Sequence, residues 1–374
     1  MADTLQDILP PDFASGQFLG RARSPAGPCV IAIRQGRLFD LTDEVSSVAG
    51  AIDRRRFAGG RDLGPVEGGL PEGWSLLSPV DLQCIKACGV TFAVSAIERV
   101  IEERARGDAA RAAEIRQGLE DKVGAGIRAV VPGSPEAAEL KQALIAEGMW
   151  SQYLEVAIGP DAEVFSKSPV LSTVGAGAEI GVRSDSEWNN PEPEIVLAVD
   201  PRGEVVGATL GNDVNLRDFE GRSALLLSKA KDNTASCALG PFIRLFDEGF
   251  TIDDVREANV DLVIEGSDGY RLEGTNVMAE ISRDPLDLVA QTLSEHHYPD
   301  GFVLFCGTLF APTQDRDTPG GGFTHKIGDV VTIASRRLGK LVNTVTTSRD
   351  APEWDFGIAA FARNLAERGL IDRI

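Results

Sequence analysis

Histidine is scarce in this sequence. The 374 residues include three histidines, and all of them, His296, His297 and His325, lie in the last third of the chain. Histidine is the usual base for activating water near neutral pH, because its ordinary pKa lies close to 7. Catalytic groups in the first 295 residues must therefore be of another kind.

Cysteine, positive charge and long apolar runs are also limited, and each shortage argues against a class of protein. Five cysteines without a Cys-x-x-Cys pair argue against a disulfide framework. The formal net charge of -20 argues against a nucleic-acid partner, which would need a basic face. No basic and then apolar leader opens the chain, and no apolar run could cross a bilayer. We therefore expect a cytoplasmic protein with reduced thiols and no membrane partner.

Residues 1–78 have the pattern of a small β-rich N-terminal domain that ends in a linker. Two short apolar runs in Cys29–Thr42 flank Gln35 and Gly36, which predicts a hairpin. The glycine- and proline-rich stretch from residue 57 to residue 74 is typical of a linker. The larger domain is expected to cover residues 79–374.

The larger domain begins with helical patterns and continues as short strands. An amphipathic pattern covers Ser95–Gly126, with an interruption expected at Gly107, and Ser134 before Pro135 predicts the start of a second helix. From Leu154 onward, short β-branched runs are separated by turn residues without alternating helices. This order predicts an α+β protein whose core is a mostly antiparallel β-roll or sandwich.

Three carboxylates stand out among the β-branched runs. Glu192 and Glu194 are two residues apart in a segment that should be extended, so both side chains point to the same side. The following strand returns to Asp213, which should lie at the same end. Carboxylates in an apolar region repel one another unless a cation neutralises them, and this donor set selects Mg²⁺ first and Mn²⁺ second. Two acids on an exposed edge strand would show the same spacing, so Glu-x-Glu alone leaves both interpretations open.

Five segments occur in the order found in the fumarylacetoacetate hydrolase superfamily, and they resemble it over residues 79–345. These segments are PEPEIVLAV, GATLGNDVNLRD, KAKDNTASCALGPF, FCGTLFAP and IGDVVTIASRRLGKLVNTV. The resemblance implies the fold of that superfamily's catalytic domain, which agrees with the β-rich pattern described above. It also implies a homo-oligomer, either a dimer or a tetramer.

The resemblance implies roles for residues at matching positions. The three carboxylates match the metal ligands of the superfamily. Lys231 matches a lysine beside the metal, where it could orient the ligands or stabilise an enolate. Gly307 and Thr308 match the turn that holds the substrate carboxylate, to which they can offer a backbone amide and a hydroxyl.

The chain departs from the superfamily's hydrolases at the pair that activates water. Ser95 stands where these enzymes have a histidine, and Glu98 stands where they have its partner glutamate. We therefore do not expect hydrolysis of a carbon–carbon bond. The segments SKAKDNTASCALGPF and LFCGTLFAPTQDRD resemble the sugar-acid dehydratase branch. This resemblance implies conversion of a 2-keto-3-deoxy-pentonate, of the xylonate or arabinonate type, to 2-oxoglutarate semialdehyde in pentose oxidation, with Ser95 contacting the substrate.

Further residues are candidates for proton transfer and substrate binding in such a reaction. Glu98 is the expected base or acid, and Lys231 the enolate stabiliser or proton partner. Glu155 is a second candidate, because Glu155 and Glu163 precede VFSKSPV, a segment that should line the site. Lys167, within that segment, is expected to bound the substrate pocket.

Two other functions remain open at this point. The same scaffold could carry a hydrolase or decarboxylase of acylpyruvates or other 2-oxo acids. A non-catalytic binding protein could also retain the pocket. For the dehydratase, and equally for the hydrolase or decarboxylase, the partner is a small 2-oxo acid and the cofactor is the divalent cation.

Overall fold

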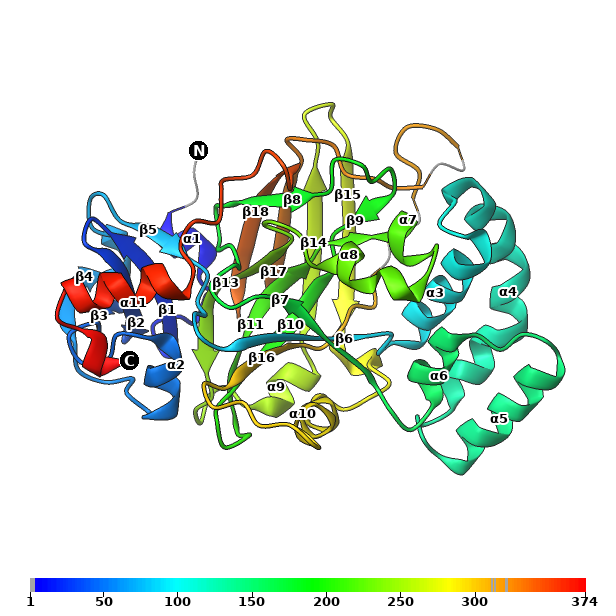
Figure 1. Ribbon diagram of the computed structural model, residues 1–374, viewed down its shortest axis with the longest axis horizontal. Coiled ribbons are helices and arrows are strands. Elements are labelled where there is room, and N and C mark those ends of the chain that lie inside the picture. Colours follow the sequence, from blue (N-terminus) through cyan, green and yellow to red (C-terminus); the bar gives the residue numbers. More distant parts are fainter. Residues whose placement is uncertain (1–3, 311, 313, 320–321) are drawn as a thin grey trace.

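The computed structural model describes residues 4–310, 312, 314–319 and 322–374, and it describes their side chains except those of residues 113 and 117–125. A large sheet runs through most of the protein (Figure 1). Its 11 strands lie in the order β4 (Arg61–Pro65), β3 (Arg37–Asp40), β2 (Gly27–Arg34), β1 (Gln17–Ser24), β13 (Cys237–Leu245), β11 (Val205–Asp213), β10 (Pro193–Val199), β16 (Phe302–Phe305), β6 (Cys84–Gly89) and β7 (Glu163–Ser168), with β5 (Ser75–Leu77) also paired to β1. Neighbouring strands are antiparallel, apart from β16 and β6, which are parallel.

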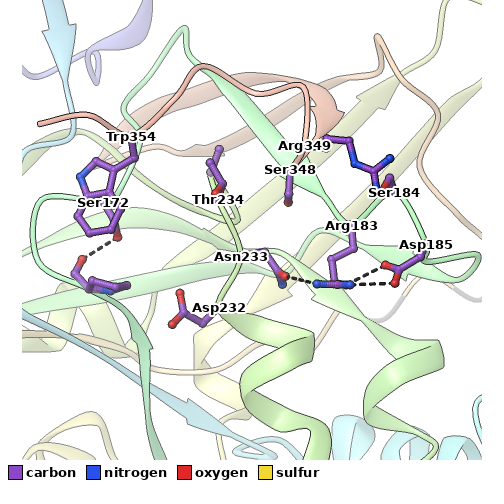
Figure 2. A pocket seen from close by; sticks show the side chains of 12 residues that line it. Ser172, Arg183, Ser184, Asp185, Asp232, Asn233, Thr234, Ser348, Arg349 and Trp354 are labelled. Atoms are coloured by element: carbon purple, nitrogen blue, oxygen red, sulfur yellow. Dashed lines mark hydrogen bonds and ion pairs between the residues drawn. The ribbon is translucent and has the colours of Figure 1, made fainter. Parts of the chain in front are cut away.

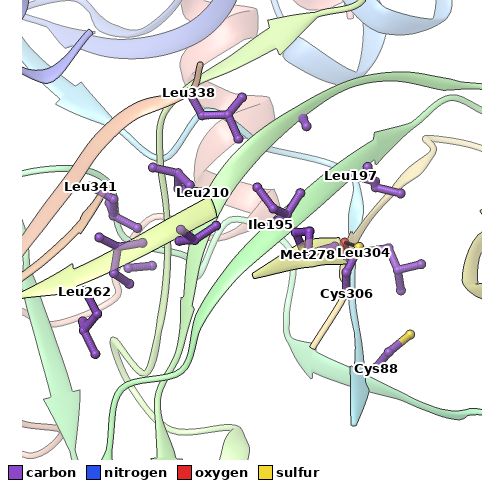
Figure 3. Close-up of a cluster of buried hydrophobic side chains, with 14 of the residues drawn as sticks. Cys88, Ile195, Leu197, Leu210, Leu262, Met278, Leu304, Cys306, Leu338 and Leu341 are labelled. Carbon is purple, nitrogen blue, oxygen red and sulfur yellow. Dashed lines mark hydrogen bonds between the residues drawn. The ribbon is translucent and has the colours of Figure 1, made fainter. Parts of the chain in front are cut away.

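A second sheet packs against the middle of the first one. Its 5 strands lie in the order β15 (Arg271–Val277), β14 (Asn259–Glu265), β17 (Val330–Ser335), β18 (Gly339–Thr347) and β8 (Glu179–Val182). Figure 3 shows the core between the sheets, where Ile195 and Leu210 of the large sheet meet Leu262 and Leu341 of the small one. The predicted α+β class with a mostly antiparallel β core is confirmed.

Strand β10 is buried on both faces, which explains why its sequence is an unbroken apolar run. Ile195 and Leu197 pack in the core between the two sheets. Val196 and Ala198, which point the other way, pack in the core on the opposite face of the large sheet. The strand that carries the predicted metal ligands is therefore central to the fold.

Helices cover the ends and one side of this β core (Figure 1). They are α1 (Leu5–Ile8), α2 (Val48–Asp53), α3 (Ala93–Ala105), α4 (Ala109–Ala129), α5 (Pro135–Ala146), α6 (Gln152–Ile158), α7 (Arg217–Glu220), α8 (Leu227–Lys231), α9 (Ile252–Arg256), α10 (Pro285–Leu293) and α11 (Ile358–Glu367). The short strands β9 (Asn189–Asn190) and β12 (Asn215–Leu216) pair beside them. None of the described helices has the length and apolar character needed to span a membrane.

The helix boundaries follow the local sequence signals. Arg106 and Gly107 have φ angles of 57° and 74°, so the chain turns between α3 and α4 as the sequence predicted. The hydroxyl of Ser134 accepts a hydrogen bond from the backbone amide of Ala137, and Pro135 occupies the first helical position of α5. Helices α3 to α6 form a helical lid on the side of the β core, drawn in cyan and green in Figure 1.

The N-terminal residues form the predicted hairpin but not all of the predicted linker. Strands β2 and β3 pair around Gln35 and Gly36, whose φ angles of 51° and 70° suit a tight hairpin turn. The expectation of a linker from residue 57 to residue 74 is wrong for β4, which pairs with β3. Leu63 of β4 packs against the N-terminal core, and this burial offsets the cost of ordering a stretch rich in glycine.

Helix α11, near the C-terminus, packs on the N-terminal strands, and Figure 1 shows this red helix beside the blue strands. Arg368 donates a hydrogen bond of 2.7 Å to the carbonyl of Pro28, and the Ser46 hydroxyl donates one to the carbonyl of Leu370. Strand β1 also pairs with β13 of the central sheet. The division into domains at residue 78 stays a prediction.

Asp81 connects the N-terminal strands to the rest of the fold, so its removal should destabilise the protein. Its carboxylate accepts hydrogen bonds from the amides of Val48 and Ala49 and lies 3.7 Å from the buried guanidinium of Arg21. We expect Asp81→Ala to lower the free energy of unfolding by about 3 kcal/mol, because Arg21 loses a buried partner. Urea denaturation measures this change.

The matched control is Asp53→Ala, which removes an ion pair between two half-exposed side chains. It should lower the free energy of unfolding by less than about 1 kcal/mol. Equal effects of the two substitutions would contradict the role given to Asp81.

Candidate metal centre

The three carboxylates predicted as metal ligands converge at one end of the large sheet. Strands β10 and β11 are antiparallel, with Pro193 opposite Asn212, so the start of β10 meets the end of β11. One oxygen from each of Glu192, Glu194 and Asp213 lies within 4.8 Å of the other two, and all three residues are buried. The alternative of surface acids on an edge strand is therefore wrong.

Positively charged side chains and a backbone amide hold these carboxylates. Lys231, from α8, places its Nζ 3.1 Å from Asp213 Oδ2 and also forms a hydrogen bond to Glu192. Lys167 Nζ lies 2.8 Å from the other oxygen of Asp213. The amide of Gly307 donates a hydrogen bond of 2.6 Å to Glu194 Oε2.

The electrostatics of the triad leave one carboxyl group poorly compensated. Burial, together with the charges of Asp213 and Glu192, raises the pKa of Glu194 well above its ordinary range. Burial opposes ionisation of Asp213 as well, but Lys167 and Lys231 lower the pKa of that carboxyl. A divalent cation at the three oxygens would remove the repulsion that acts on Glu194. The donor set of three carboxylate oxygens fits a hard cation such as Mg²⁺ or Mn²⁺.

The triad opens into a small cavity of 20 Å³. Ser95, Gly307 and Thr308 line it, as the sequence predicted for substrate-binding residues. Gly307 has a φ of 91°, and a Cβ atom there would lie 2.0 Å from the Thr91 hydroxyl, so the turn requires glycine. The substrate-binding roles of these three residues stay predictions.

The structure does not bring three other predicted site residues into this cavity. Glu98 receives hydrogen bonds from Arg116 and Arg217 and is not among the residues that line the cavity. Glu155 pairs with Lys141 on the lid, and its side chain is 44% exposed. The sequence suggested these acids by their position in family-like segments, but neither contacts the triad.

Lys167, predicted to bound the substrate pocket, instead lies behind the triad. It is fully buried, bonds to Asp213 and comes within 3.4 Å of the carbonyl of Val214. It is not among the cavity-lining residues. Its observed contacts orient a metal ligand.

Arg99, Glu163 and Glu220 line the cavity, although sequence analysis gave them no role. Arg99 binds Glu192 at 2.6 Å and Glu220 at 2.9 Å. Helical periodicity could have revealed Arg99, which lies one turn after Ser95 on the same face of α3. Glu220 is the last residue of the four-residue helix α7, which is too short for a periodic pattern to indicate the direction of its side chain.

A buried network of ion pairs continues from Arg99 into the lid. Arg99 also binds Glu102 at 2.6 Å, and Glu102 accepts a hydrogen bond of 2.7 Å from Arg217. Arg217 contacts Glu98 at 3.1 Å, and Glu98 in turn pairs with Arg116 of α4. The network therefore connects Glu192, a predicted metal ligand, to two lid helices through alternating charges.

Comparison with known proteins identifies the family. The family model for the fumarylacetoacetate (FAA) hydrolase C-terminal domain matches residues 140–346, which is more than half of the chain. The chain belongs to this FAA hydrolase family. The predicted resemblance is thereby confirmed, and the metal-ligand strands and Lys231 lie within the matched residues.

Two curated proteins are similar in sequence. A probable 2-keto-3-deoxyxylonate dehydratase of Haloferax volcanii is 34% identical over 199 residues, which are 53% of this chain and 65% of the relative. A 2-dehydro-3-deoxy-D-arabinonate dehydratase of Saccharolobus solfataricus is 32% identical over 187 residues, 50% of this chain and 59% of the relative. The chain thus covers less than two thirds of either relative.

Solved structures share the fold. A 2-keto-3-deoxy-D-arabinonate dehydratase in its apo form superposes with a TM-score of 0.64 at 22% identity, covering 88% of this chain and 99% of that one. The same enzyme complexed with magnesium and 2,5-dioxopentanoate gives a TM-score of 0.62 at 21% identity and the same coverage. These structures confirm the FAA hydrolase fold.

The electrostatics of the triad predict a pH-dependent gain in stability from a divalent cation. Because the folded-state pKa of Glu194 is raised, its contribution to stability is present below pH 4.5 and is lost as the pH rises through the raised pKa. A cation relieves this loss, so the increase in melting temperature with Mn²⁺ should be larger at pH 8 than at pH 5.5. Differential scanning fluorimetry with and without Mn²⁺ measures it.

In the Glu194→Gln variant, the increase in melting temperature caused by Mn²⁺ should be the same at pH 5.5 and pH 8. The substitution should also weaken Mn²⁺ binding at least a hundredfold, as measured by electron paramagnetic resonance. Glu155→Gln, which changes an acid outside the cavity, is the matched control and should retain both properties. A variant at Glu194 that binds Mn²⁺ like the unaltered protein would disprove the metal centre.

Proposed function

We propose that the protein is a Mg²⁺-dependent dehydratase that converts a 2-keto-3-deoxy-pentonate to 2-oxoglutarate semialdehyde. The observation that carries the proposal is a buried triad of carboxylates, paired with a lysine, in a cavity with no histidine among its lining residues. The names of the two curated relatives, both dehydratases of such acids, support it. Mn²⁺ is the second choice of cation.

The reaction removes one water in balanced steps. A base takes a proton from C3, the electrons of that bond form a C3–C4 double bond, and the C4 hydroxyl leaves as water after protonation. Transfer of a proton from C5 to C3 then gives an enol, which tautomerises to the aldehyde at C5. Mg²⁺ bound at the triad would act as a Lewis acid toward the carboxylate and 2-oxo oxygens.

Lys231 is placed to stabilise negative charge that develops on the substrate. Although burial acts against its charge, Asp213 and Glu192 raise the pKa of Lys231, so it remains protonated at neutral pH. A protonated lysine donates hydrogen bonds but cannot accept a proton. We therefore assign Lys231 as the enolate stabiliser and not as the base.

Glu163 is the best-placed group for the C3 proton. It lines the cavity, and its carboxyl has no hydrogen-bond or ion-pair partner in the described part of the chain. A Cβ atom on Gly89 would lie 2.0 Å from Glu163 Oε2, so the glycine makes room for this carboxyl. Burial raises the pKa of Glu163, which suits a group that accepts and returns a proton near neutral pH.

Glu220 is placed to supply the proton for the leaving hydroxyl. Burial raises its pKa to about 7, despite the opposing charges of Arg99 and Lys231. At neutral pH a substantial share of this carboxyl is therefore protonated. With Glu163 as base and Glu220 as acid, the cavity holds both partners of the elimination.

The thiol in the cavity does not favour a nucleophilic mechanism. Cys88 lines the cavity, and burial raises its pKa well above the ordinary value, so it stays protonated. Covalent catalysis by a thiolate is therefore not part of the proposal.

The first experiment is a coupled assay of semialdehyde formation from 2-keto-3-deoxy-xylonate and 2-keto-3-deoxy-arabinonate, with and without Mg²⁺. Glu163→Gln should lower kcat at least a hundredfold, because it removes the proton acceptor and leaves the metal ligands in place. Glu155→Gln, on the exposed side of the lid, should leave kcat within twofold.

Other outcomes would select the alternative functions. Metal-dependent cleavage of acylpyruvates without dehydration would replace the proposal with a hydrolase or decarboxylase. Binding of 2-oxo acids without turnover of any of them would indicate a non-catalytic protein. A fully active Glu163→Gln variant would overturn the assignment of the base alone.

We also infer a cytoplasmic homo-oligomer. The five cysteines are unpaired and four are buried, which fits a reducing compartment. The homo-oligomer is what the resemblance to the fumarylacetoacetate hydrolase superfamily implies. Light scattering after gel filtration distinguishes a dimer or tetramer from a monomer.

A further inference from the structure

A second cavity, of 480 Å³, is lined in part by the loop that directly follows α8 and its last residue, Lys231 (Figure 2). Its walls come from the residues after β8, the loop after α8 and the segment after β18, and Figure 2 shows Arg183, Asn233 and Ser348 on these three walls. It shares no lining residue with the cavity at the triad. Its volume is in the range of sites for small molecules.

Polar groups in this second cavity lack partners within the described chain. Arg349 has no hydrogen bond or ion pair there, and neither does the carboxyl group of Asp232. The hydroxyl oxygen of Ser348 is buried and has no hydrogen-bond partner among the described residues. A buried polar atom without a partner costs free energy, which a ligand recovers when the Ser348 hydroxyl turns into the cavity to bond to it.

Arg183 differs from Arg349, since its guanidinium is already engaged. It forms two hydrogen bonds of 2.8 Å to Asp185 and one of 3.2 Å to Asn233 (Figure 2). This pairing fixes one wall of the cavity and leaves Arg349 as the positive charge that can receive an anion. An arginine pairs with a carboxylate through two parallel hydrogen bonds.

Trp354 adds an apolar wall across from these polar groups. Figure 2 shows its indole ring standing over Ser172, on the side of the cavity away from Arg349. The residue is 46% exposed, so its ring is available to a ligand. A flat aromatic face contacts the C–H groups of a sugar chain while its hydroxyls bond elsewhere.

We propose that this cavity is a second binding site, for a small polyhydroxy carboxylate such as an aldonic acid. Arg349 receives the carboxylate, Asp232 and Ser348 bond the hydroxyls, and Trp354 covers the carbon chain. An anion without hydroxyls would leave Asp232 and Ser348 without partners, and a neutral sugar would leave Arg349 without one.

A ligand bound in the second cavity affects Lys231 through the short loop that follows this residue. Asp232 directly follows Lys231, and the hydroxyl of Ser236 donates a hydrogen bond of 2.8 Å to the Lys231 carbonyl. The amide of Asn233, in the second cavity, donates one of 3.0 Å to that same hydroxyl. A ligand that contacts this loop therefore shifts the backbone of Lys231, and this consequence, unlike the binding itself, rests on the proposed function.

Calorimetric titration of the metal-free protein with D-xylonate tests the site independently of any turnover. We expect one equivalent to bind, with acetate and xylitol each binding at least tenfold more weakly because each supplies half of the recognised groups. Arg349→Ala should weaken xylonate binding at least tenfold. The matched control is Arg336→Ala, an exposed arginine in the turn between β17 and β18 without a partner in the described chain.

Several results would overturn the proposal. They are the absence of xylonate binding, unchanged binding by the Arg349→Ala variant, or binding of acetate as tight as that of xylonate. Loss of binding in Glu194→Gln would assign the ligand to the triad cavity instead. A melting temperature and subunit mass of Arg349→Ala equal to those of the unaltered protein exclude unfolding or a lost subunit contact as the cause.

Discussion

The repulsion among three buried carboxylates is the constraint around which the rest of this structure is arranged. Antiparallel β10 and β11 bring these acids together at the end of the sheet, where a low dielectric strengthens their interaction. Lys167, Lys231 and Arg99 each approach a different carboxylate oxygen of Glu192 or Asp213. Among the described residues, Glu194 receives a hydrogen bond only from the amide of Gly307. The unequal compensation leaves a negative charge at Glu194 that a cation would neutralise.

The ion pairs around the triad serve geometry more than stability. Removing charges from water costs roughly as much as their pairing returns, so a buried network contributes little net free energy of folding. Its value lies in the fixed directions of its guanidinium groups. Through Arg99, Glu102 and Arg217, the orientation of Glu192 depends on how α3 and α7 pack against the β core. A movement of the lid would therefore change the orientation of Glu192 in the triad.

The sequence was sufficient for features that depend on neighbours along the chain. The spacing of Glu192 and Glu194 predicted two side chains on one side, and Ser134 predicted where α5 starts. Side chains that act through contacts between distant segments were harder to place. Glu98 and Glu155 occupied suggestive positions, but arginines from α4 and α7 surround the first, and Lys141 pairs with the second. Glu163 could be noticed in its segment, but its free carboxyl depends on the glycine at position 89 of the neighbouring strand.

The closure of α11 onto the N-terminal strands has a consequence for synthesis in the cell. A ribosome makes the chain from its first residue, so β1 to β4 emerge long before the residues that cover them. Ser46 hydrogen-bonds to the carbonyls of Leu370 and Arg373, and Leu370 lies 324 positions after it in the chain. The N-terminal strands therefore stay partly uncovered until α11 and the residues after it have been made. During that interval a chaperone has its longest opportunity to bind, and the edge of the sheet is most exposed to pairing with another nascent chain.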